Sequence, residues 1–238
     1  KSAKETIHNA IQAALHKATE YALWTLEKDS KQPASTVAHK VYAAGSGAVG
    51  GAFGLAGLPF VLPVTTIIIL RSIAEIARGE GMDLSDPRVK IECVNVFSFG
   101  GKSKKDDASD EGYYATRMLL GNTMRKLTEE LAKRAAEKAG QTVAEEVSHK
   151  ASGKLAQYMA ELIEKIAERF GFTITQKTAG QTVPVIGAVL GAALNTIFID
   201  YYQDIAKAHF TLLRLEKQYG AEEVREAYDN AKKYLNLA

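Results

Sequence analysis

Apolar residues recur every three or four positions along most of this chain, a pattern that predicts helices. Near the N-terminus, six apolar residues would share one face of a helix over 3–28: Ile7, Ile11, Leu15, Ala18, Ala22 and Leu26. Similar spacing predicts further helices over about 64–78, 113–139, 142–170 and 221–235. The β-like stretch 89–101 has no second strand to pair with, so a helix is expected there too. We therefore predict an all-α protein, a single-domain helical bundle over 1–238.

Two long segments contain no charged side chain, although 24% of the chain is charged. They cover 41–70 and 178–199, which are 30 and 22 residues long. At a rise of ~1.5 Å per residue, a helix of roughly 20 apolar residues matches the hydrocarbon core of a bilayer. The second segment is expected to continue as one helix as far as Gly220. We expect both segments to form Gly-rich, hairpin-like helical elements that are buried in protein or in lipid.

Glycines in these segments are spaced for close contact between helices. Three pairs stand four residues apart: Gly47 with Gly51, Gly50 with Gly54, and Gly187 with Gly191. Small residues at this spacing let helix backbones approach each other closely. Residues 45–50 also spell GxGxxG, but no strand precedes them and Leu70 stands where a ribose-binding acid belongs. Helix packing is therefore the predicted role.

Charge and cysteine content narrow the functional classes. The net charge is +2, from 30 basic and 28 acidic residues, which gives no strong positive field for nucleic acid. Cys93 is the single cysteine and cannot form an internal disulfide, which fits a reducing compartment such as the cytoplasm. Segment 102–110 is charged and has no large apolar side chain, so we expect an exposed loop without chemistry.

A row of polar residues follows one side of the predicted C-terminal helix at a spacing of seven: Asn195, Tyr202, His209 and Glu216. Successive members would lie ~10.5 Å apart along the axis, so they cannot bind one metal together. Their predicted partners are polar residues on the other uncharged helix: Thr65, Thr66, Arg71 and Glu75. A satisfied core network is favoured over a ligand site, because buried polar groups usually have hydrogen-bond partners for structural reasons alone.

Common catalytic signatures are missing from the sequence. HExxH, GxSxG and CxxC do not occur. We therefore predict no catalytic residues, no metal and no cofactor, and an enzyme is the less favoured class.

Two blocks contain unusual strings, namely LPVTT before LRSIAEIAR, and PVIGA followed by HF and RLE. These blocks, within about 38–101 and 178–220, resemble the EcsC protein family of bacteria, named for a protein encoded alongside an ABC transporter. The resemblance implies a helical, membrane-associated bacterial protein. It carries no established catalytic residue set that could be transferred to this chain.

Three functions follow from these patterns, in order of preference. The first is a non-enzymatic protein at the inner face of the cytoplasmic membrane, accessory to transport or secretion, with membrane lipid or a membrane transporter as partner. The second is a soluble helical protein that binds a lipid-like apolar ligand in a cavity between the two uncharged segments. The third is a hydrolase or metal enzyme that uses the neighbourhood of Arg71, Glu75 and His209.

Overall fold

The computed structural model describes the chain except for residues 1–2, 26–57, 101–111, 138–153, 179–183 and 235–238. The described part is helical, and no strand occurs in it. Its elements are α1 (Ala3–Thr25), α3 (Leu58–Gly79), α4 (Pro87–Asn95), the 3-10 helix η2 (Val96–Gly100), α5 (Gly112–Glu137), α7 (Lys154–Thr178), α8 (Pro184–Tyr219) and α9 (Ala221–Tyr234). The prediction of an all-α protein is confirmed.

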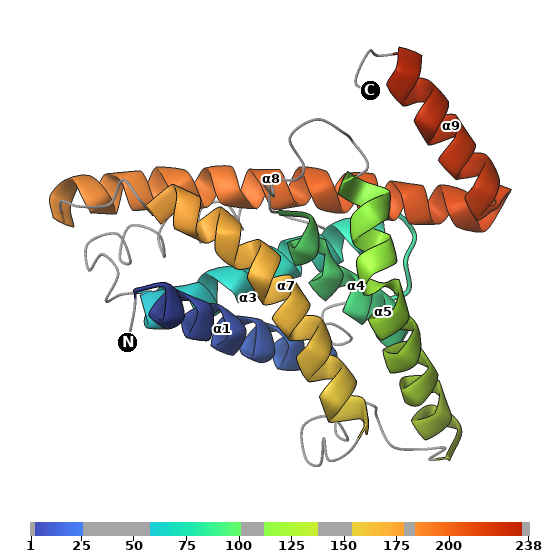
Figure 1. Cartoon of the computed structure of the whole chain (residues 1–238), viewed down its shortest axis with the longest axis horizontal. Helices are drawn as coiled ribbons and strands as arrows, with labels where there is room; N and C mark the ends of the chain where they lie inside the picture. Colours follow the sequence, from blue (N-terminus) through green and yellow to red (C-terminus); the bar gives the residue numbers. More distant parts are fainter. Residues whose placement is uncertain (1–2, 26–57, 101–111, 138–153, 179–183, 235–238) are drawn as a thin grey trace.

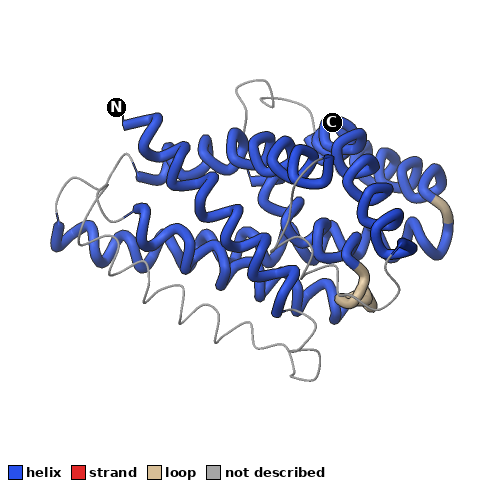
Figure 2. Tube along the Cα trace, turned by 90° about the horizontal axis from the view of Figure 1, so that it is seen from below, coloured by secondary structure: helices blue, strands red, loops and turns tan. Residues whose placement is uncertain are grey.

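The longest helix, α8, has 36 residues and runs across the whole width of the view in Figure 1. Helix α3 packs against α8, and α1 packs against both α3 and α7. The short α4 and η2 lie between these helices and α5. Figure 2 shows that only short loops interrupt the helices of the described part.

One hydrophobic core joins these helices. It takes buried side chains from α1, α3, α4, η2, α5, α7 and α8. The largest wholly buried side chains are Tyr202, Phe97 and Phe210. Burial of a large apolar side chain stabilises the fold by about 1.5 to 3 kcal/mol, so these residues hold α8 against η2 and its neighbours.

Helix α3 begins at Leu58, six residues before the predicted start at Val64, and contains Pro63. Pro59 and Pro63 are residue types that commonly interrupt a helix, which is why the sequence predicts a later start. Pro59 lies in the first turn, where backbone N–H groups have no partner within the helix anyway. Pro63 removes one helical hydrogen bond, but Leu62 and Thr65 on either side of it are buried. Tertiary packing therefore carries the helix through the proline.

The second boundary that differs is the end of α7. The predicted helix ended at Phe170, whereas α7 continues through Gly171 to Thr178. A glycine within a helix costs only about 1 kcal/mol relative to alanine, so it does not stop a helix by itself. The predicted first part of this helix, 142–153, lies outside the described residues.

The remaining helix predictions agree with the structure. Stretch 89–101 is helical through α4 and η2 as far as Gly100, and α8 runs without a break to Tyr219. Residues 184–199 of the second uncharged segment are thus one continuous helix and do not turn back as a hairpin. Residues 41–57 of the first uncharged segment and the charged loop 102–110 lie outside the described residues.

The predicted stop after α3 is also present. Gly81 has φ of 81°, a left-handed conformation that favours glycine, and its N–H donates to the Arg78 carbonyl. Asp86 then caps α4 by accepting a hydrogen bond from the Arg88 N–H, with Pro87 in the first turn. This turn sets the direction of α4 and thereby places Glu92 against α8.

A buried hydrogen bond joins α3 to α8. The Gln203 amide donates to the Ser72 hydroxyl at 2.6 Å, and both side chains are buried. Ser72→Ala should leave the amide unpaired and lower the free energy of unfolding by about 1 to 3 kcal/mol. Adding Gln203→Leu should recover most of that loss, because neither polar partner then remains buried. Chemical denaturation of the single and double variants measures this, and purely additive losses would contradict the pairing.

Candidate functional site

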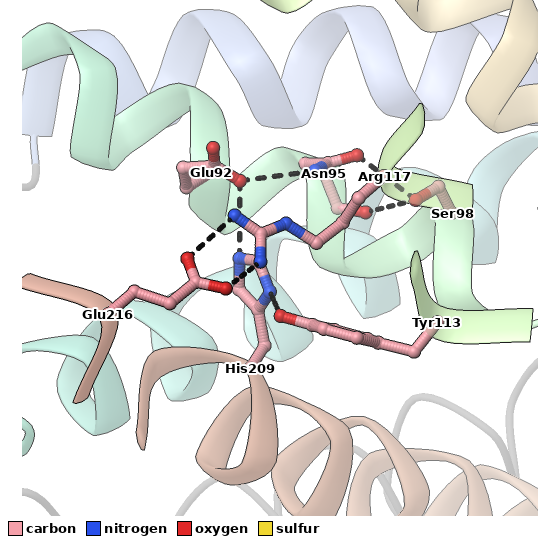
Figure 3. A network of polar contacts seen from close by, with 7 residues as sticks. All are labelled: Glu92, Asn95, Ser98, Tyr113, Arg117, His209 and Glu216. Atoms are coloured by element: carbon pink, nitrogen blue, oxygen red, sulfur yellow. Dashed lines mark hydrogen bonds and ion pairs between the residues drawn. The ribbon is translucent and has the colours of Figure 1, made fainter. Parts of the chain in front are cut away.

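A network of polar side chains lies where α4, η2, α5 and α8 meet. Seven residues form it: Glu92, Asn95, Ser98, Tyr113, Arg117, His209 and Glu216. Figure 3 shows them converging from separate helices, and we call them the buried polar network. Two of the seven, His209 and Glu216, belong to the predicted polar row on α8.

His209 is the centre of the network and has 0% of its surface exposed. Its Nδ1 lies 2.9 Å from the Tyr113 hydroxyl, and its Nε2 lies 3.1 Å from Oε2 of Glu92. A neutral imidazole satisfies both contacts when Nε2–H donates to the carboxylate and Nδ1 accepts from the phenol. Both ring nitrogens are therefore occupied by residues of other helices.

Neighbouring residues on α4 and η2 orient the Glu92 carboxylate, which accepts the hydrogen bond from His209. Glu92 and Asn95 are three residues apart and so share a helix face, and the Asn95 amide donates to Glu92 Oε2 at 3.1 Å. The Ser98 hydroxyl lies 2.6 Å from the Asn95 carbonyl and 3.0 Å from its Oδ1. Asn95 and Ser98 thereby hold the carboxylate in place for His209.

A second contact joins α5 to α8, one turn further along α5 than the contact between Tyr113 and His209. The Arg117 guanidinium binds both carboxylate oxygens of Glu216, at 2.5 and 2.9 Å. Two-pronged pairs of this kind are geometrically specific as well as strong. Tyr113 and Arg117 are four apart on α5, and His209 and Glu216 are seven apart on α8, so the two helices meet at two successive positions.

The surroundings change the acid strength of several members. Burial raises the pKa of Glu92, but hydrogen bonds with His209 and Asn95 and the charge of Arg117 outweigh it and lower that pKa overall. Burial raises the pKa of the Tyr113 phenol. Burial would lower the pKa of Arg117, but its hydrogen bonds to Glu216 and nearby negative charges raise it overall. At neutral pH Glu92 is therefore a carboxylate, Arg117 is a guanidinium cation and Tyr113 is a neutral phenol.

Aromatic rings close the network on one side. The Phe99 ring stacks on Tyr113 at 5.1 Å and packs against His209 at 5.2 Å between ring centroids. Such contacts add about 0.5 to 1.5 kcal/mol beyond the area they bury. They also keep water from the imidazole, so its bonds to Glu92 and Tyr113 act in a medium of low polarity.

The side chains of the network are already engaged with one another. Nothing is left on the His209 ring to take a proton from a substrate, and Glu216 already occupies the Arg117 guanidinium. In the part of the chain that the structure describes, no three His, Cys, Asp or Glu side chains gather to hold a metal ion. Cys93 is wholly buried, and burial raises the pKa of its thiol.

The other predicted site residues lie elsewhere. Tyr202 is buried, with its ring 5.1 Å from that of Phe97. Thr65 and Thr66 are buried on α3, and the Thr66 hydroxyl has no hydrogen-bond partner among the described residues. Arg71 and Glu75 are half-buried on α3. Thus His209 and Glu216 find their partners on α4 and α5, and not among the predicted residues of α3.

Several predicted residues fall where the structure gives no side-chain description. Asn195, Gly187 and Gly191 lie within α8, but their surroundings are not described. Gly47, Gly50, Gly51 and Gly54 lie outside the described residues altogether. Close packing at these glycines stays a prediction.

Five of the seven network residues are not predicted from the sequence: Glu92, Asn95, Ser98, Tyr113 and Arg117. The sequence did contain one signal, namely pairs of polar residues spaced to share a helix face. Glu92 and Asn95 are three residues apart, and Tyr113 and Arg117 are four apart. The two pairs lie on either side of the charged segment 102–110, for which the sequence predicts an exposed loop without chemistry. The apolar pattern instead points to the uncharged helix that became α3 as the source of partners for the polar row on α8.

The fold and its network define an all-α protein whose helices are joined by buried polar contacts. The chain belongs to the EcsC protein family, whose sequence model matches residues 1–215. The match ends within α8, so α9 follows the matched region. Comparisons with curated proteins and with solved structures gave no significant match. Among the described helices, none combines the length and the hydropathy needed to cross a membrane.

Two neighbouring tyrosines test the importance of the bond to His209. Tyr113→Phe removes the hydroxyl that His209 contacts, leaving Nδ1 buried and unpaired, so unfolding should become easier by about 1 to 3 kcal/mol. Tyr114→Phe is the matched control, because the Tyr114 hydroxyl has no hydrogen-bond partner among the described residues. Thermal and denaturant unfolding compare the two variants. Equal losses would contradict the assigned role of the Tyr113 hydroxyl.

The lowered pKa of Glu92 makes stability depend on pH. Its contribution is present above the pKa of the unfolded chain, about 4.3 for glutamate, and disappears as pH falls through the lower folded value. The free energy of unfolding should therefore fall more steeply in the wild type than in Glu92→Gln between about pH 6 and about pH 3. Denaturant titrations across this range give the two slopes. Parallel slopes would show that the carboxylate is not stabilised in the folded state.

Proposed function

We propose that this chain is a non-enzymatic protein that binds the inner face of the bacterial cytoplasmic membrane and assists a membrane transport or secretion process. Membrane lipid is the proposed direct partner, with a membrane transporter as the proposed client. Membership of the EcsC family supports the proposal, since the family is named for a protein encoded alongside an ABC transporter. The distribution of charge along α3 and α8 is the observation on which the proposal rests.

Both uncharged segments lead into helices that begin toward the same side of the molecule. In Figure 1, α3 and α8 both start at the left and run to the right, and the two helices pack against each other. The first charged residue is Arg71 on α3 and Asp200 on α8. At this end the described residues of α3 and α8 carry no charge, so contact with lipid there would take no charged group of these two helices out of water.

An apolar side chain lies at the surface of this uncharged end. Val64 on α3 is 50% exposed, and Ile67 and Ile68 beside it are only partly buried. A lone exposed apolar residue is ordinary in any protein. Its position within thirty uncharged residues distinguishes Val64 and makes it the proposed point of lipid contact.

A lipid-like ligand is the second candidate function, and one cavity supports it. The space between α8 and α9 measures about 570 Å³ and is lined by Leu212, Leu215, Tyr219, Glu223, Val224, Ala227 and Tyr228. Small-molecule sites commonly enclose about 300 to 1,000 Å³ with mostly apolar walls. This cavity lies near the end of α8, whereas the sequence pattern predicts one between the two uncharged segments.

Flotation with phospholipid vesicles tests the membrane proposal. The wild type should float with vesicles of phosphatidylethanolamine and phosphatidylglycerol. Val64→Asp should reduce the bound fraction about tenfold or more, because an acidic side chain in an apolar lipid contact costs roughly 2 to 3 kcal/mol. Leu119→Asp is the control, since Leu119 is 64% exposed on α5, which lies toward the right in Figure 1, whereas α3 and α8 begin at the left.

Two results would contradict the proposal. One is the absence of wild-type protein from the floating fraction. The other is an equal loss of binding in Val64→Asp and Leu119→Asp, which would mean that any added negative charge repels the vesicle. Circular dichroism of both variants confirms that the helices are retained, so that a loss of binding is not a loss of fold.

A further inference from the structure

Helix α9 is attached to the rest of the molecule at few places. Val224 is its only buried residue in the described part, and most of its other side chains are exposed. Figure 1 shows α9 leaving the end of α8 at a sharp turn and projecting away from the bundle. Gly220 makes this turn with φ of 99°, a conformation that other residues rarely adopt. The geometry is that of a hinge followed by a loosely held helix.

An aromatic cluster holds α9 against α5. The Tyr228 ring packs on Tyr114 at 5.2 Å and on Tyr113 at 6.3 Å between centroids. The Arg225 guanidinium lies 5.4 Å from the Tyr114 ring, and that of Arg117 lies 5.6 Å from the Tyr113 ring. Stacked rings and cations over rings each contribute about 0.5 to 1.5 kcal/mol. We call these five residues the aromatic latch.

Between the hinge and the latch, α9 does not pack fully on α8. The 570 Å³ space separates the two helices, with Leu212 and Leu215 on one wall and Val224 and Ala227 on the other. A second space of about 440 Å³, lined in part by Leu212 and Tyr228, adjoins the same helices. The latch and Val224 therefore supply most of what keeps α9 in place.

Residues of the latch are also members of the buried polar network. Tyr113 contacts Tyr228 through its ring and His209 through its hydroxyl. Arg117 lies over the Tyr113 and Tyr114 rings while it binds Glu216. The carbonyl of Glu216 accepts the N–H of the hinge residue, Gly220. Hinge and latch are thus each one contact away from the His209 site.

We propose that α9 is a hinged strap, and that the buried polar network determines how firmly the strap is latched. In the latched state, Tyr228 covers the Tyr113 and Tyr114 rings. In the released state, rotation at Gly220 uncovers these rings together with Leu212 and Leu215 of α8. Segments with few buried contacts open locally at a much lower free energy than the whole fold. Release therefore leaves the core helices folded.

Hydrogen exchange of the intact chain tests the strap. Tyr228→Ala should speed exchange of α9 amides by about tenfold or more, because it removes the central ring of the latch. Tyr234→Ala is the control on the same helix, since Tyr234 is 88% exposed. Amides of α3 around Ile69 and Ile73 should keep their wild-type rates in both variants. Unchanged α9 rates in Tyr228→Ala, or equal acceleration in α3, would overturn the strap.

A second pair of variants tests the coupling to His209. Tyr113→Phe and Tyr114→Phe both keep their rings in the latch, but only Tyr113→Phe breaks a bond to His209. Exchange of α9 amides should be several-fold faster in Tyr113→Phe and unchanged in Tyr114→Phe. Glu92→Gln, on α4 and outside the latch, should also alter α9 exchange. Equal α9 rates in all three variants and the wild type would overturn the coupling while leaving the hinge intact.

Discussion

The fully buried His209, bonded at both ring nitrogens, is the contact on which the arrangement of α4, α5 and α8 depends. An imidazole removed from water is costly unless each nitrogen finds a partner. Here the partners come from two other helices, Glu92 on α4 and Tyr113 on α5. Any packing that moves either helix leaves a buried polar group unsatisfied. The network thereby selects one arrangement of three helices, a specificity that apolar packing alone does not supply.

The short helix α4 depends on this contact with His209 for its place in the fold. A helix of nine residues is not stable alone in water, because nucleation is costly and few hydrogen bonds repay it. Its Asp86 cap and Pro87 define where it begins, and its apolar residues Ile91 and Val94 are buried. The hydrogen bond between Glu92 and His209 then ties it to the later turns of α8. Helix α5 is tied to α8 in the same region by Tyr113 and Arg117.

Helix α8 joins two regions of different chemistry. Its first part belongs to an uncharged segment, whereas its later turns carry His209 and Glu216 and end at the Gly220 hinge. The matched EcsC region covers the first of these regions and six of the seven residues of the buried polar network; it stops just before Glu216 and does not reach α9. A contact with lipid at the uncharged end and a movable strap at the other end would therefore use opposite parts of one helix. The core between them is held by Tyr202, Phe97 and Phe210.

Helical periodicity in the sequence determined the fold class, because the spacing of apolar residues is a local property that each helix displays by itself. The same spacing put His209 and Glu216 on one face of α8 and indicated that they need partners. Only the tertiary structure decided which partners, since Tyr113, Arg117 and Glu92 lie 96, 99 and 117 residues away from the groups they bond. Helix ends near Pro63 and Gly171 were likewise decided by tertiary context, which outweighs a single unfavourable residue. Contacts between distant segments depend on how all the helices pack together, and a local pattern in the sequence does not specify that packing.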